Sequence, residues 1–119
     1  MIQVKRIYEK SSDEDGMRVL VDRLWPRGLS KNKAMVDFWM KEVAPSNELR
    51  KWFSHDADKW DEFKKLYFEE LNQKEEYVQK LLETAKESDM TLLYAARDVN
   101  FNNAVALKEY LESRLTKNQ

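Results

Sequence analysis

Charged and aromatic residues follow two apolar runs of the chain, and their types suit the recognition of an anion. The first run, RVLV (residues 18–21), continues as DRLWPRG, and the second, TLLYAA (residues 91–96), continues as Arg97-Asp98. If the two runs are parallel neighbouring strands, their charged ends lie at one edge of a sheet, where open α/β sheets bind ligands. The sequence therefore predicts a ligand site at this edge.

Three arginines and a tryptophan are the candidate ligand-binding residues of these strand ends. Arg23, Arg27 and Arg97 offer planar, paired donors for phosphate or carboxylate, and Trp25 offers a ring on which a flat ligand can stack. A final helix that starts directly after Asp98 would add free N–H groups and the positive end of its dipole. These features favour an anionic small molecule as the partner.

Two further residues are candidates for catalysis. Asp22 would act as a base or as an orienting group, and His55, the only histidine, as a proton carrier, because an imidazole titrates near neutral pH. A structural interpretation stays open for the whole set. Asp22 and Arg23 would then form an exposed ion pair that contributes little to stability. Trp25 would close one end of the core, and His55 would be a loop residue without a catalytic role.

Composition excludes several functional classes. The 119 residues contain no cysteine and one histidine, which disfavours zinc sites of the usual ligand set, and we expect neither a metal nor a cofactor. The motifs G-x-S-x-G, the P-loop and G-x-G-x-x-G are absent from the sequence, so the familiar hydrolase, NTPase and Rossmann dehydrogenase classes do not apply. No apolar run approaches the ~20 residues of a membrane span. With no apolar signal core at the N-terminus, this predicts a cytoplasmic location without membrane attachment.

The charge is unevenly distributed along the chain. Residues 1–55 hold 11 basic and 8 acidic residues, residues 56–89 hold 6 and 11, and residues 90–119 hold 4 and 3, within a net charge of -1. The acidic middle opposes broad nucleic-acid binding, which needs a large basic surface. It leaves room for a small anion site.

Alternating apolar and polar segments predict a small α/β domain. Residues 2–8, 17–22 and 90–96 read as strands, and the consecutive apolar residues of the last two favour strands covered on both faces. Residues 35–43 are ambiguous. The predicted fold is a single domain over residues 1–116 with a short tail, 117–119, and a central, largely parallel sheet of three to four strands flanked by helices.

Capping and periodicity predict the helices. Ser46 caps a helix over residues 47–53, and a stripe of apolar residues from Trp60 to Leu71 marks a second helix. Asn72 and Glu75 resemble a capping box, which places the start of a third helix at that point. A last helix carries its buried stripe from residue 104 to residue 115, with residue 100 or 102 as its N-cap.

The remaining aromatic residues are expected in the core. Trp39, Trp52 and Trp60 read mostly as core residues, and Tyr94 as a core residue whose hydroxyl seeks a partner.

Three stretches resemble the YeaO-like family of bacterial proteins with domain of unknown function 488. They are DGMRVLVDRLWPRG, WMKEVAPSNELRKWFSHD and TLLYAARDVNFNNAVALKEYL, which keep the order and spacing of the family across essentially the whole chain. The resemblance implies a small α/β domain with a largely parallel sheet, and it implies no established activity. The family usually has lysine where this chain has Arg97, which weakens any role for a lysine amine as a nucleophile.

The resemblance also widens the set of candidate residues. It adds Arg6, Tyr94 and Asn102 to the ligand-binding candidates. The matching positions are Arg6, Asp22, Arg23, Trp25, Pro26, Arg27, Gly28, Trp39, Lys41, Pro45, Ser46, Leu49, Arg50, Phe53, His55, Tyr94, Ala96 and Asn102.

Three functions remain open at this point, in descending order. The first is an enzyme or binding protein for an anionic small molecule, such as a phosphorylated metabolite or a nucleotide. The second is a nucleic-acid module, in which Trp25 and the basic residues between positions 23 and 33 contact the strand. The third is a protein-interaction module without chemistry.

Overall fold

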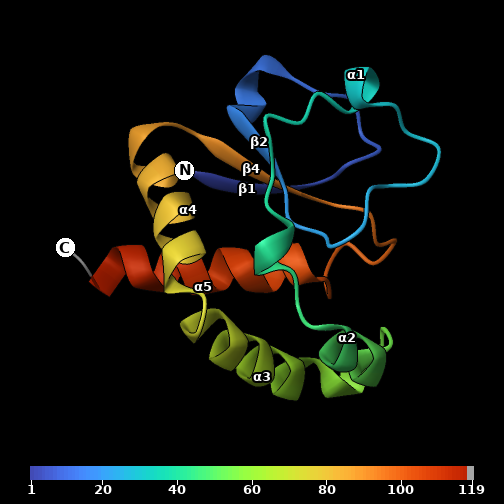
Figure 1. Ribbon diagram of the computed structural model, residues 1–119, viewed down its shortest axis with the longest axis vertical. Helices are drawn as coiled ribbons and strands as arrows, with labels where there is room; N and C mark the ends of the chain where they lie inside the picture. The colour runs from blue at the N-terminus through green and yellow to red at the C-terminus, as the bar shows by residue number, and fades with distance from the viewer. Residues whose placement is uncertain (118–119) are drawn as a thin grey trace.

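Four short strands form the centre of the molecule, and all of them run in the same direction. The computed structural model, which describes residues 1–117, contains β1 (Ile2–Arg6), β2 (Met17–Leu20), β3 (Phe38–Trp39) and β4 (Met90–Tyr94). Their order across the sheet is β1-β4-β2-β3, and every neighbouring pair is parallel (Figure 1). The predicted α/β fold with a parallel sheet is therefore confirmed, including the pairing of β2 with β4.

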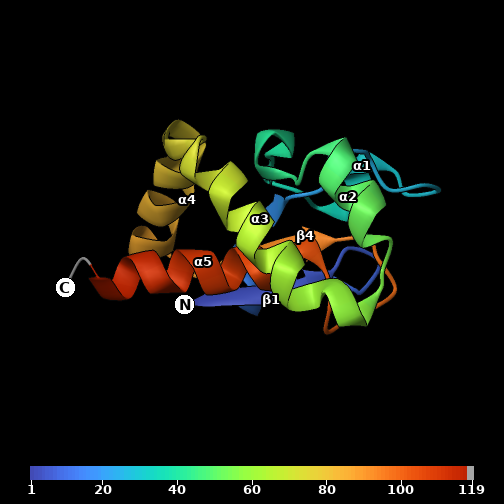
Figure 2. The same cartoon turned by 90° about the horizontal axis from the view of Figure 1, so that it is seen from below.

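Helices lie on both faces of this sheet, and most of them lie on one face. The helices are α1 (Lys31–Ala34), α2 (Asn47–Phe53), α3 (Trp60–Asn72), α4 (Glu75–Glu87) and α5 (Asn103–Lys117), with short 3-10 turns at Asp13–Asp15, Lys41–Val43 and Ala57–Lys59. Helix α5 packs directly on β1 and β4, and α3 and α4 pack in turn against α5 (Figures 1 and 2). Since this layer supplies most of the apolar surface, the main core lies between the sheet and the helices.

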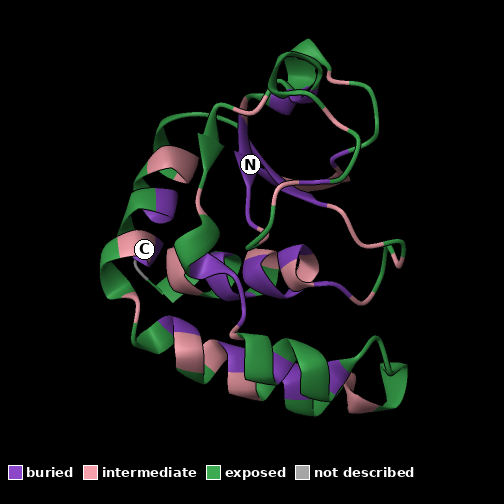
Figure 3. Cartoon of the chain, turned by 45° about the vertical axis from the view of Figure 1, so that its right-hand side comes forward, coloured by how far each residue is buried: buried purple, intermediate pink, exposed green. Residues whose placement is uncertain are grey.

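A smaller core lies on the other face of the sheet. Ile7, Leu20, Ala34 and Leu93 form it, and the segment from residue 22 to residue 36, which contains α1, covers it. Strand β4 and most of β2 are buried between the two cores, whereas β3 and the outer surfaces of the helices are exposed (Figure 3). Burial on both faces explains why β2 and β4 have consecutive rather than alternating apolar residues.

A buried ion pair fixes the covering segment to the sheet. The guanidinium of Arg18, on β2, donates to Asp15 at 2.6 Å and to the carbonyl oxygens of Ala34 and Met35, both at 2.9 Å. Lys5, on β1, adds a second cation 3.2 Å from Asp15. Helix α1, only four residues long, is therefore held by a side chain of the sheet.

Some expectations from the sequence are wrong. Trp39 and Trp52 are each 39% exposed and are not core residues, whereas Trp60 packs against the main core and Tyr94 is buried. Asn72 does not cap a helix: α3 continues through it, α4 begins at Glu75, and the Asn72 amide oxygen accepts from the Tyr110 hydroxyl at 2.6 Å.

Other expectations match the structure. Ser46 caps α2 by accepting from the Leu49 N–H, and α2 has the predicted bounds. The ambiguous residues 35–43 contain the two-residue strand β3 and a 3-10 turn. Helix α5 extends to Lys117, and residues 118–119 of the predicted tail lie outside the described residues. Within residues 1–117, no helix is long and apolar enough to cross a membrane.

Candidate functional site at the carboxyl edge of the sheet

The segments that follow the strands are tied together at one edge of the sheet, which we call the carboxyl edge. In Figure 1, β1 begins near the N label and runs toward this edge. Arg6, the last residue of β1, donates through Nε to the carbonyl oxygen of Ala96 beyond β4, at 3.1 Å. Its guanidinium lies 4.6 Å from the centre of the Tyr8 ring, and the Tyr8 hydroxyl donates to the carbonyl oxygen of Arg27 at 3.0 Å. Side chains thus link the segments beyond β1, β2 and β4.

Asp22 is a cross-link between elements at this edge. One of its oxygens accepts from the Ala95 N–H at 2.9 Å, and the other accepts from the Asn103 amide at 3.0 Å. The indole of Trp39 donates to the Asp22 backbone carbonyl at 2.8 Å. Burial raises the pKa of the Asp22 carboxyl, although the hydrogen bonds from Ala95 and Asn103 and the charge of Arg50 act to lower it. Asp22 therefore joins β2, β4, β3 and the start of α5.

Most of the arginines gather at the carboxyl edge and lack acidic partners. Among residues 1–117, Arg18 and Arg114 form ion pairs with carboxylates, and both lie elsewhere in the fold. The remaining arginines have no carboxylate oxygen within 4.0 Å among those residues: Arg6, Arg23, Arg27, Arg50 and Arg97. All of these except Arg6 are exposed.

The carboxylates of the same edge bond to the backbone instead. Glu9 accepts from the Arg6 N–H at 2.9 Å, and Asp98 accepts from the N–H groups of Asn100 and Phe101 at 2.9 and 3.1 Å. The two bonds to Asp98, together with the nearby His55, hold the pKa of its carboxyl below the ordinary value. Glu9 and Asp98 therefore bond to backbone N–H groups and form no ion pair with these arginines within residues 1–117.

The two tryptophans of the edge form a rigid pair. The Trp25 indole donates to the Leu29 carbonyl at 2.7 Å, and the rings of Trp25 and Trp39 meet edge to face with 5.5 Å between their centres. The Lys41 ammonium lies 5.4 Å from the centre of the Trp39 ring. Both indole N–H groups are thus satisfied within the protein.

Two other predicted site residues have structural roles. Asn102 is buried, donates to the Asp98 carbonyl at 2.9 Å and caps α5 by accepting from the Val105 N–H at 3.0 Å. Helix α5 begins at Asn103 and not directly after Asp98, so the expected free helix terminus already has a cap. Tyr94 is paired with Arg6 in the sheet register, and burial raises the pKa of its phenol.

His55 lies apart from Asp22. It is exposed in the turn between α2 and α3, where Ser54 and His55 both have left-handed backbone angles, with φ of 44° and 59°. Its ring centre is 6.3 Å from that of Phe53, and its charge acts on Asp98. Within the described part of the chain, no hydrogen bond joins His55 to Asp22. The structure therefore does not assemble these two into an acid–base pair.

The chain segment before α2 positions Arg23. Three successive carbonyl oxygens of this segment each accept from a side chain: Val43 from Tyr67 at 2.5 Å, Ala44 from Lys74 at 3.3 Å and Pro45 from Arg23 at 3.2 Å. Burial raises the pKa of the Tyr67 phenol and lowers the pKa of the Lys74 ammonium. These contacts hold the start of α2, which carries Arg50, against the carboxyl edge.

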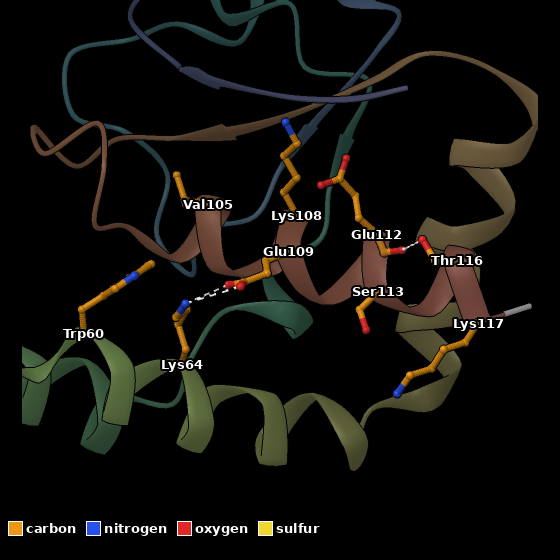
Figure 4. A pocket seen from close by; sticks show the side chains of 9 residues that line it. All are labelled: Trp60, Lys64, Val105, Lys108, Glu109, Glu112, Ser113, Thr116 and Lys117. Carbon is orange, nitrogen blue, oxygen red and sulfur yellow. Dashed lines mark hydrogen bonds and ion pairs between the residues drawn. The ribbon is translucent and has the colours of Figure 1, made fainter.

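Two grooves of the molecular surface lie away from the carboxyl edge. One runs between α3 and α5, is lined by residues such as Trp60, Lys64 and Glu112, and is crossed by the ion pair of Lys64 with Glu109 (Figure 4). A second lies between α2 and α3, beside Trp52 and Glu69. None of the predicted site residues lines either groove. Within residues 1–117, no three histidine or carboxylate side chains are placed to share a metal ion.

Two residues of the edge are missing from the sequence-based candidates. Asn103 holds Asp22, and Arg50 lies close enough for its charge to act on the same carboxylate. The double asparagine at positions 102–103 is a signal for a helix start, but which of the two reaches back to the sheet depends on the tertiary fold. Arg50 matches the family pattern and has no local signal of a site.

A parallel α/β domain with an arginine-rich carboxyl edge is the class of protein that this fold and site define. All 119 residues match the family model described as the "Inactive DUF488-N3 subclade". The chain therefore belongs to the DUF488 family, as the motifs predict, and the matching model places it in the inactive N3 subclade.

Relatives match almost the full chain. The uncharacterized protein YeaO of Escherichia coli (strain K12) is 43% identical over 94% of this chain and 97% of its own. The uncharacterized protein Rv3073c of Mycobacterium tuberculosis (strain ATCC 25618 / H37Rv) is 40% identical over 95% of each chain. No solved structure matches the chain.

Proposed function

We propose that the protein binds, without catalysis, a small molecule carrying a phosphate or carboxylate group at the carboxyl edge of its sheet. One observation carries the proposal: among residues 1–117, the arginines of this edge lack acidic partners while its carboxylates accept from backbone N–H groups. A guanidinium can bind either anion through two parallel hydrogen bonds. We further propose a cytoplasmic location, the compartment in which phosphorylated metabolites are made and consumed.

Two observations support binding without catalysis. Both oxygens of Asp22 accept hydrogen bonds that hold the fold together, and no hydrogen bond within residues 1–117 joins His55 to Asp22. The description of the matching subclade as inactive agrees with this arrangement. In the proposed function, Arg27 and Arg97 contact the anion, whereas Asp22 shapes the edge.

Thermal melting with a panel of anions tests the proposal. The panel contains inorganic phosphate, sugar phosphates, nucleotides and dicarboxylates, and a ligand at about one hundred times its Kd adds about 2.7 kcal/mol of stability, a rise of several degrees. The substitutions Arg27→Ala and Arg97→Ala remove guanidinium groups that make no hydrogen bond within residues 1–117, so the free protein should melt as the wild type does. Each should reduce the shift caused by the ligand.

A charge-matched control separates a site from general attraction. Lys65 is exposed on α3, away from the carboxyl edge, and Lys65→Ala changes the net charge by the same amount. It should leave the ligand-induced shift intact. The proposal fails if no anion of the panel shifts the melting temperature, or if all three variants reduce the shift equally.

A further inference from the structure

Each strand of the sheet is followed by both a cation and an exposed apolar side chain. Large exposed apolar residues stand after every strand end: Tyr8 after β1, Leu24 after β2, Trp39 at the end of β3 and Val99 after β4. The cations Arg6, Arg23, Lys41 and Arg97 occupy the corresponding segments. A ligand that was only an inorganic anion would leave the apolar half of this surface without a partner.

Two contacts within the protein hold the Trp39 side chain. The indole N–H of Trp39 donates to the Asp22 backbone carbonyl, and the Trp25 ring packs edge to face against the Trp39 ring. The ring therefore has a fixed orientation and offers a face rather than a donor. The nearby Lys41 ammonium is exposed, so a flat ligand can displace it from the ring, and it can then pair with the anionic group of the ligand.

From this arrangement we infer that the ligand is a phosphate ester with a planar ring, of the nucleoside monophosphate class, whose ring stacks on Trp39. This inference rests on the proposed function, because the carboxyl-edge arginines would bind the phosphate. An exposed aromatic ring at the same sheet edge as these arginines suits such a ligand, since every base has a π-face and stacking tolerates different bases.

The charge distribution favours a single nucleotide over an extended strand. The carboxyl edge supplies a local group of arginines, whereas residues 56–89, which form α3 and α4, hold 11 acidic and 6 basic residues. A long phosphate backbone leaving the edge along these helices would meet like charge, and non-specific strands need a continuous basic path. One phosphate needs only the edge.

Calorimetric titration of the intact protein tests the inference. The titrants are adenosine 5′-monophosphate, ribose 5-phosphate and inorganic phosphate, with a ten-residue oligothymidylate and vesicles containing anionic lipid as further arms. We expect the monophosphate to bind about tenfold or more tightly than ribose 5-phosphate, because only the former carries a base that can stack.

Three variants assign that difference to Trp39. Trp39→Leu should bring both affinities to the level of ribose 5-phosphate, and Trp39→Phe, which loses the same indole hydrogen bond but keeps a ring, should retain part of the difference. Trp52→Leu is the matched control: Trp52 is also 39% exposed and has Lys59 5.1 Å from its ring centre, but it lies on α2 beside the second groove. It should leave the difference unchanged.

The outcomes separate the ring from the anion. If the monophosphate and ribose 5-phosphate bind equally and both depend on Arg27, the proposed function stands and the ring inference is overturned. If no phosphate compound binds, the proposed function itself fails. Tighter binding of the oligothymidylate, with a steep salt dependence, or binding to vesicles alone also overturns the inference.

Discussion

At the scale of single residues, Asp22 shows how an apparent catalytic acid can be a structural one. Its carboxylate accepts from the Ala95 N–H and the Asn103 amide, which belong to segments more than seventy residues away along the chain. Burial raises its pKa, so the ionised form has a cost that these hydrogen bonds offset. The side chain is retained in this environment because it satisfies two donors of the sheet edge.

We therefore expect Asp22→Ala to destabilise the protein. The substitution leaves the N–H of Ala95 without an acceptor and removes one of the two acceptors of the Asn103 amide, which still donates to the Val21 carbonyl. We expect a loss of about 1–3 kcal/mol of unfolding free energy. Chemical denaturation measures the loss. Glu83→Ala removes an exposed carboxylate of α4 and should have little effect. Unchanged stability of Asp22→Ala would contradict the structural role of the carboxylate and make Asp22 a candidate for catalysis again.

At the scale of elements, the start of α2 depends on Ser46. Its hydroxyl oxygen accepts from the Leu49 N–H at 3.1 Å, and Glu70 of α3 accepts from both the Ser46 N–H at 2.8 Å and the hydroxyl at 2.6 Å. The cap therefore also joins α2 to α3. Because α2 carries Arg50, this contact helps to set the arginine edge.

Removing this cap should lower stability without disrupting the fold. Ser46→Ala loses the acceptor of the Leu49 N–H and the donor to Glu70, and we expect a loss of about 1–2 kcal/mol in unfolding free energy. Ser46→Thr keeps both functions and should remain close to the wild type. Ser30→Ala, which removes the cap of the four-residue α1, is a comparison with less helix to lose. Equal stability of Ser46→Ala and the wild type in denaturant titration would show that the cap contributes nothing.

Local signals predict the elements better than they predict the contacts between them. The bounds of α2 follow from Ser46, a capping residue that acts over three positions, and the burial of β2 and β4 follows from their consecutive apolar residues. The expected cap at Asn72 is wrong because its amide bonds with Tyr110, 38 positions away, which no local pattern encodes.

The same distinction applies to the candidate site. The strings after β2 and β4 indicate the position of the carboxyl edge, because parallel strands end on one side of a sheet. Asn103 and the exposure of Trp39 could not be predicted, since both follow from long-range packing: β3 is a two-residue edge strand with little cover.

At the scale of the whole molecule, the response to acid should depend on the buried Asp15. This carboxylate is 3% exposed and joins β1, β2 and the segment covering the second face through Lys5 and Arg18. Burial acts to raise the pKa of Asp15, but the Ser12 N–H and the two cations lower it by more, so the pKa lies below the ordinary value. A depressed carboxyl pKa contributes stability above the unfolded value, near 3.9, and that stability is lost as the pH falls through the folded pKa.

Asp15→Asn should therefore change both the height and the shape of the stability profile. At pH 7 it leaves Arg18 buried with no acidic partner, which costs about 3–5 kcal/mol. Below about pH 4 the wild type progressively loses the contribution of Asp15 and the variant has none to lose, so the gap between the two unfolding free energies should narrow as the pH falls. Asp13→Asn removes an exposed carboxylate from the same turn, and its unfolding free energy should show the same pH dependence as that of the wild type. A constant gap between Asp15→Asn and the wild type down to pH 2 would mean that the loss comes from packing and not from the charge of Asp15. A gap that narrows on acidification would instead show that the acid sensitivity of the fold arises from the ion pair that attaches the second face to the sheet.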